Sequence, residues 1–162
     1  AAGGGAVVSG TGAFTSVEAD RDVSVAVAGD ANAFLALRGI GPNSEYVTTT
    51  DGQLGLDLTG SNPTNAGGQG VNTDAITVIE DVIEVRNQGT QAVDVEATPL
   101  TFVETSSGDA LTLLLVPGSG FPSVTIGVGE TETYSVIVDD FSPGGSQQGI
   151  SDTVTFTAEA TE

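Results

Sequence analysis

The sequence predicts an all-β protein, an antiparallel sandwich of two sheets built from about nine or ten short strands. Three observations lead to this fold class. Valine, isoleucine, leucine and threonine recur at a period of two along most of the chain. Turn-forming glycine, proline, asparagine and aspartate separate these runs at intervals of roughly 8–15 residues. Helical periodicity is marginal, and the 162 residues are enough for one domain with a single core.

The first element is a glycine-rich strand over residues 1–15. One of its faces is small or apolar and consists of Ala6, Val8, Gly10, Gly12 and Phe14. Two of the five residues on this face are glycines, so the segment would be unstable as an isolated strand and needs a host sheet. We therefore expect a donor strand that completes another copy of the protein.

A linker follows the donor strand, because the apolar phase moves from even to odd positions before the next strand. The alternation breaks over Thr15, Ser16, Val17, Glu18, Ala19, Asp20 and Arg21. We assign residues 1–15 to the donor strand, 16–21 to the linker and 22–162 to the sandwich domain.

The next strands are expected over 22–28, with Val23, Val25 and Val27 inward, and over 53–58, with alternate leucines inward. Between them, residues 33–37 form a short apolar run typical of a buried strand, and residues 43–51 are polar and partly extended. Residues 59–70 form a loop rich in glycine, asparagine and proline.

Residues 75–86 fit either a helical stripe or a strand, and their β-branched content favours a strand. An Asn-x-Gly sequence then predicts a β-hairpin, with arms at 82–87 and 91–97. Further strands are expected over 100–104, 111–116, 123–128, 133–138 and 152–158.

Charge excludes several classes of partner. The chain has 22 acidic residues, three Lys or Arg, no His and a net charge of −19. Nucleic acids and anionic membranes are excluded, because neither can be bound without a basic surface. A hydrophobic content of 38% argues against disorder. Such acidity is suited to molar salt, where charge repulsion is screened, so we expect a halophile.

The sequence does not predict an enzyme. Without His or Cys, Ser-His-Asp triads, Cys-His pairs and the usual zinc sites are unavailable. The carboxylate pairs Asp139 with Asp140 and Glu130 with Glu132 are read as a solvated acidic surface. A weak Ca²⁺ site remains conceivable at Asp139, Asp140 and Asp152, and no other cofactor is expected.

Two motifs resemble a known family. Residues 10–16, Gly-Thr-Gly-Ala-Phe-Thr-Ser, precede an acidic residue and a valine-rich strand, and residues 83–95 read Ile-Glu-Val-Arg-Asn-Gln-Gly-Thr-Gln-Ala-Val-Asp-Val. Both are similar to motifs of the TasA/camelysin-like surface proteins, with the chain resembling a haloarchaeal branch. The resemblance implies a jelly-roll sandwich that polymerises into extracellular fibres, in archaea as bundling pili. The peptidase activity described for camelysin-type members is not carried over, because the chain has no histidine.

The leading hypothesis is a structural subunit of an extracellular filament, a pilus or biofilm-matrix fibre, that polymerises head to tail by donor-strand complementation. Val8 and Phe14 would fill pockets of the neighbouring copy, with Ser9 and Thr11 outward. One alternative is that residues 1–15 pair with their own domain. Another is a monomeric acidic cell-surface or S-layer-associated adhesin.

The chain itself carries no signal peptide and no apolar run long enough to span a membrane. Its opening on Ala-Ala suggests a processed, exported protein. The expected partners are other copies of the chain, with contacts to the cell envelope or to neighbouring filaments.

Overall fold

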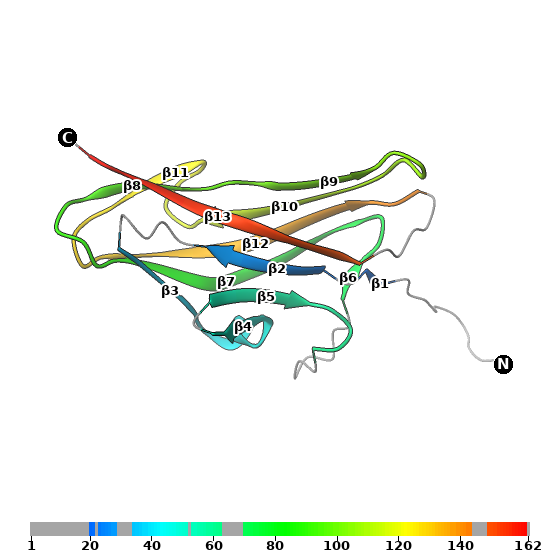
Figure 1. Cartoon of the computed structure of the whole chain (residues 1–162), viewed down its shortest axis with the longest axis horizontal. Helices are drawn as coiled ribbons and strands as arrows, with labels where there is room; N and C mark the ends of the chain where they lie inside the picture. The colour runs from blue at the N-terminus through cyan, green and yellow to red at the C-terminus, as the bar shows by residue number, and fades with distance from the viewer. Residues whose placement is uncertain are drawn as a thin grey trace.

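The computed structural model of the chain is an all-β sandwich of two packed sheets, which confirms the predicted fold class (Figure 1). The structure describes residues 20–21, 23–28, 34–51, 53–62, 70–143 and 149–161. This part contains thirteen strands, two of them only two residues long, and one short 3₁₀ helix. The strands exceed the expected nine or ten because short strands also form where the sequence pattern suggested loops.

The five-stranded sheet has the order β3-β7-β12-β10-β9, and all its neighbours are antiparallel. Side chains on β10 and β12 alternate regularly between buried and half-buried or exposed. The strands are β3 (Leu35–Gly39), β7 (Ala75–Asn87), β9 (Leu100–Glu104), β10 (Asp109–Pro117) and β12 (Thr131–Phe141).

The second sheet has six strands in the order β11-β8-β13-β2-β5-β4. Its strands are β2 (Val23–Ala28), β4 (Val47–Thr50), β5 (Gln53–Leu58), β8 (Val93–Ala97), β11 (Ser123–Ile126) and β13 (Ile150–Ala160). The pair β2 and β13 is parallel, which departs from the wholly antiparallel sandwich expected. No short turn joins these two strands, so no hairpin forces them to run in opposite directions.

Two short connections close the sandwich at its margins. The 3₁₀ helix Pro42–Tyr46 carries the chain from β3 in one sheet to β4 in the other. There the sheets approach closely, because a Cβ added at Gly39 would lie 2.8 Å from the Cβ of Val47. β1 (Asp20–Arg21) pairs with β6 (Val71–Asn72), so the last two residues of the predicted linker form a short strand.

The core between the sheets is almost entirely aliphatic. Val23, Val25 and Val27 are buried, as the alternation predicted, and the inward leucines of β5 are buried too. Near the centre, Tyr134 and Phe156 pack edge to face with ring centroids 4.9 Å apart. The remaining large core residues are valines, leucines and isoleucines from both sheets.

The predicted hairpin over 82–97 is wrong. Residues 75–87 form one strand, as favoured, but β7 lies in the five-stranded sheet and β8 in the six-stranded sheet. The connection therefore crosses between sheets. It is held by Asn87, whose side-chain amide donates to the carbonyls of Gln91 (2.7 Å) and Ile126 (3.0 Å). β7 and β8 each direct alternate side chains into the same core. Their sequence pattern is therefore the same whether they pair as a hairpin or lie in opposite sheets.

The run at 33–37 is less buried than expected. β3 is an edge strand, and Leu35 and Leu37 are only partly buried. Phe34 is exposed and has a positive φ of 53°. The strand therefore has one covered face and one open edge, in place of burial on both sides.

Candidate assembly surfaces

The predicted donor residues lie outside the described residues. This applies to Ala6, Val8, Gly10, Gly12 and Phe14 and to residues 15–19 of the linker. The sheet edges that could receive such a strand lie within the described residues.

The central strand β13 has an unpaired half. Its residues Phe156–Ala160 pair with β8 on one side, whereas Ile150–Thr155 pair with β2 on the other. β8 ends after Ala97, with one last bond from the Thr98 N–H to the Thr155 carbonyl (2.9 Å). The chain then crosses to β9 in the opposite sheet. Within the described ranges, no strand pairs with the β8 side of residues 150–154.

The backbone groups on this open edge follow from strand geometry. The Thr155 carbonyl and the Thr161 N–H both point toward the β8 side, at Thr98 and Ala92. Because N–H and C=O groups alternate between the two edges of a strand, Ser151 and Thr153 also present theirs on this side. These are the groups that an added strand would bind.

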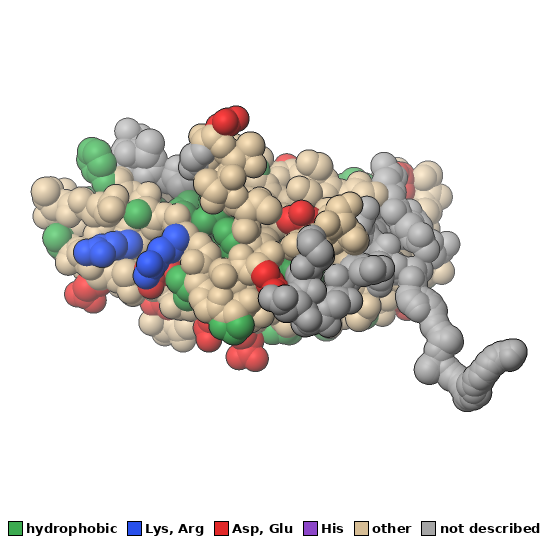
Figure 2. All heavy atoms as spheres, turned by 90° about the horizontal axis from the view of Figure 1, so that it is seen from below, with side chains coloured by type: hydrophobic (Ala, Val, Ile, Leu, Met, Phe, Trp, Pro, Cys, Tyr) green, Lys and Arg blue, Asp and Glu red, His purple; other side chains and the backbone are tan. Residues whose placement is uncertain are grey.

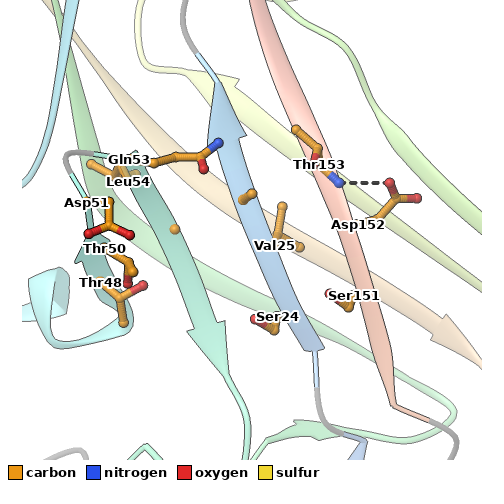
Figure 3. A pocket seen from close by; sticks show the side chains of 12 residues that line it. Ser24, Val25, Thr48, Thr50, Asp51, Gln53, Leu54, Ser151, Asp152 and Thr153 are labelled. Carbon is orange, nitrogen blue, oxygen red and sulfur yellow. Dashed lines mark hydrogen bonds between the residues drawn. The ribbon is translucent and has the colours of Figure 1, made fainter.

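Asp152 covers part of this edge. Its carboxylate accepts the Thr153 N–H at 2.8 Å, and its side chain lies on the side of β13 away from β2 (Figure 3). By register Asp152 stands beside the buried Val25, yet it is exposed. A charge at a core-facing position of an edge is a known protection against unwanted pairing. Asp152 therefore caps the open edge in the isolated chain.

β9, in the opposite sheet, carries both an apolar and an acidic side chain. Phe102, on the facing edge strand β9, is only partly buried and packs against the core. Glu104 ends β9, and the hydroxyl and N–H of Ser106, both donating to its carboxylate, hold the pKa of Glu104 below its ordinary value. β9 is the strand of the opposite sheet that contacts β13, so the strand facing this edge carries a partly buried aromatic side chain and a carboxylate.

The two outer faces of the sandwich differ in chemistry. The six-stranded sheet shows hydroxyl and acidic side chains, and a shallow hollow of about 590 Å³ lies over β2, β4, β5 and β13 (Figure 3). The five-stranded sheet exposes Ile76, Val78, Val103 and Phe141. Two arginines, Arg38 and Arg86, stand on neighbouring strands at one end of this face. Figure 2 shows the blue basic side chains gathered toward one end of the molecule.

The carboxylates considered as Ca²⁺ ligands do not gather. Asp139 is exposed on β12, whereas Asp140 is buried and accepts hydrogen bonds from the Ser142 hydroxyl and the Asp74 N–H. Asp152 lies in the other sheet. No group of three potential ligands occurs in the part of the chain that the structure describes. Asp139 and Asp140 point to opposite sides of β12, so their adjacency in sequence makes no pair.

The acidic pair Glu130 and Glu132 also separates. Glu130 is exposed, while Glu132 is buried and accepts hydrogen bonds from both the N–H (3.1 Å) and the hydroxyl (2.6 Å) of Ser119. The expectation of a uniformly solvated acidic surface is therefore wrong for Glu132 and Asp140, which anchor local structure.

Three features were missed by the sequence reasoning. The buried side chain of Asn87 hydrogen-bonds across the crossing between the sheets, and Asp152 caps the open edge of β13. The outer face of the five-stranded sheet exposes apolar side chains. Only the last had a clear signal. The run Leu113-Leu-Leu-Val116 is apolar at every position, which is typical of a strand that presents apolar side chains on both faces.

Comparison with known proteins gives no relative. No family model, no curated protein and no solved structure matches the chain. Across the described residues, no helix has the length and apolar character needed to cross a bilayer. The assignment of function consequently rests on the sequence pattern and the surfaces described above.

Proposed function

We propose that this chain is a structural subunit of an extracellular filament, assembled head to tail by donation of its N-terminal strand to the next copy. The observation that carries the proposal is the unpaired half of β13 at Ile150–Val154. An extended segment added there would gain main-chain hydrogen bonds from Ser151 and Thr153 and would lie on the side of β13 where β9 of the opposite sheet also approaches.

The proposed donor has suitable length and pattern. Fifteen extended residues span about 50 Å, whereas the five residues of the open edge span about 17 Å. The surplus would let the donor reach from one copy into another. Val8 and Phe14, on one face of the donor, would point toward the core of the acceptor, and Gly10 and Gly12 would permit close approach to the acceptor backbone. A head-to-tail contact of this kind does not close on itself and so produces a filament.

The first test uses two matched substitutions in the donor. Phe14→Asp places a charge on the face proposed to be buried, and Thr11→Asp places the same charge on the opposite face. We expect Phe14→Asp to abolish filaments in negative-stain images while the far-ultraviolet circular dichroism stays unchanged. Thr11→Asp should still polymerise. Equal behaviour of the two variants would contradict the proposed faces of the donor.

The second test removes the donor. A chain lacking residues 1–14 should remain monomeric, and filaments formed by that chain would refute donor-strand assembly altogether. Adding a synthetic peptide of residues 1–15 to the truncated chain should raise its melting temperature, because the peptide binds the folded state only. A scrambled peptide of equal composition is the control.

The main alternative is a monomeric acidic adhesin of the cell surface, and the polar hollow over β2, β4, β5 and β13 is the feature that favours it. Native material imaged only as discrete particles in molar salt would support the adhesin. Bundled or single filaments would support the proposed subunit and its extracellular location.

A further inference from the structure

The outer face of the five-stranded sheet carries two rows of apolar side chains, separated by a row in which Thr101, Thr112 and Asp139 precede Ile76. In one row Val103 stands opposite Ala110, which stands opposite Phe141. In another, Ile137 stands between Leu114 and Val78. Ile76 pairs with Asp139 in the row between them. We call this surface the apolar face, and it comprises Ile76, Val78, Val103, Leu114, Ile137 and Phe141.

The apolar face is open to solvent. Ile76 is 66% exposed, Val103 is 59% exposed, and Val78 and Phe141 are each 56% exposed. Outward positions on the other sheet are instead polar, such as Ser24, Glu96 and Thr155. A chain with 22 acidic residues has ample polar side chains for its surface. A contiguous apolar area in such a chain marks an interaction surface.

The dimensions of the apolar face suit a small protein interface. It spans four neighbouring strands about 4.8 Å apart and three rows about 6.8 Å apart, so it covers on the order of 350 Å². Specific interfaces bury roughly 800 Å² on each partner and consist of an apolar core within a polar rim. The apolar face would supply that core, with Thr101 and Thr112 in its middle row, and polar side chains at its margin such as Thr133 of β12 would supply the rim. The resulting contact is weak and reversible.

Charge favours this face over the opposite one for contact with a second copy of the chain. Asp139 is the one charged side chain among these three rows of described residues. Arg38, which is ion-paired with Glu84 (2.7 Å), and Arg86 stand on the same sheet. The opposite face carries unpaired rows of carboxylates, including Asp94, Glu96 and Glu159. Two chains of net charge −19 therefore repel each other least when their apolar faces meet.

We propose that the apolar face packs against the same face of a second copy, sheet on sheet. Two sheets in this arrangement lie about 10 Å apart with strands nearly aligned. A two-fold axis running along β12 sets Val78 of one copy opposite Leu114 of the other. The same axis brings the two copies of Asp139 near each other. Association is therefore opposed at low ionic strength and favoured in molar salt, and it does not depend on the donor strand.

The experiment is sedimentation velocity on the full chain carrying Phe14→Asp, which removes the competing assembly route. The chain is compared at about 0.1 M and about 3 M KCl over a range of protein concentrations. We expect a monomer–dimer equilibrium that strengthens at high salt. Val78→Glu should weaken the dimer about tenfold or more, whereas Thr155→Glu, on the opposite face, should leave it unchanged. Asp139→Asn should tighten the dimer at low salt.

A second measurement identifies the contacting face. The chain has no cysteine, so a spin label on Thr112→Cys or Thr155→Cys is unique. In the proposed dimer the two labels at position 112 lie within roughly 25 Å of each other, while those at position 155 lie on the outer sides. A monomer at every concentration in 3 M KCl overturns the proposal. So does a dimer equally insensitive to Val78→Glu and Thr155→Glu, or one with the shorter distance at position 155.

Discussion

Replacement of Asn87 tests the account of the crossing between the two sheets. Asn87 is completely buried. Its side chain donates to the carbonyls of Gln91 and Ile126 and accepts the Gly89 N–H at 2.8 Å. Asn87→Ala removes three hydrogen bonds, each contributing about 1 kcal/mol, and leaves backbone groups without a partner. We expect a loss of about 2–4 kcal/mol in the free energy of unfolding.

Asn87→Asp gives a sharper test at the same position. The aspartate can still accept the Gly89 N–H, but its second oxygen faces two carbonyl oxygens and cannot donate while ionised. At neutral pH the Asp variant should be less stable than the Ala variant. Burial and the two carbonyls favour the protonated carboxyl in the folded state, so its pKa is raised above the unfolded value. The missing stability should return as the pH falls through the folded pKa.

The assay is urea unfolding at fixed high salt, followed by circular dichroism, at several pH values. The difference between the Asp and Ala variants is the measured quantity, because both share every other carboxylate of the chain. The reasoning fails if Asn87→Ala costs less than about 1 kcal/mol. It also fails if the difference between the two variants does not change with pH.

Three further predictions concern single positions. Burial raises the pKa of Tyr134, and its buried hydroxyl has no hydrogen-bond partner in the described structure. Tyr134→Phe should therefore keep or raise the melting temperature. A loss above about 1 kcal/mol in the free energy of unfolding would show that the hydroxyl has a partner. Gly39→Ala places a Cβ 2.8 Å from a valine across the sandwich and should cost about 1–3 kcal/mol in urea unfolding, whereas Gly120→Ala meets nothing within 4 Å and should be nearly neutral. Asp152→Ala exposes the Thr153 N–H on the open edge and should speed filament growth measured by light scattering; slower growth would show that Asp152 aids assembly.

Alternation was sufficient to predict which side chains face the core. Val23, Val25 and Val27 are buried because a strand period of two admits only one inward set. The same logic correctly gave β5 and the later strands. These inferences depend on local periodicity alone, which the sequence carries directly.

Partner strands could not be predicted in the same way. Asn87-Gln-Gly89 reads as a hairpin turn, yet its amide bonds to Ile126, 39 residues further along the chain. β2 and β8 pair with different halves of β13, and this difference also depends on contacts between residues far apart in the sequence. Because the open edge arises from that offset, no inspection of residues 150–154 alone could have revealed it. The donor residues lie outside the described residues, and their faces remain predictions.

The acidic composition and the two assembly surfaces have a common physical dependence on salt. The backbones at facing copies of Asp139 would be about 10 Å apart and their carboxylates closer, so the charges lie within about one Debye length at 0.1 M salt but beyond the roughly 3 Å Debye length at 1 M. Their repulsion is accordingly reduced only moderately at low salt and almost removed at high salt. The open edge of β13 is subject to the same effect, since Asp152 lies on it and any donor belongs to a chain of net charge −19. Apolar contact is less affected by screening and is strengthened by excluded salts. If the two proposed surfaces are used, we therefore expect their carboxylates to oppose association in dilute salt and to permit it in concentrated salt.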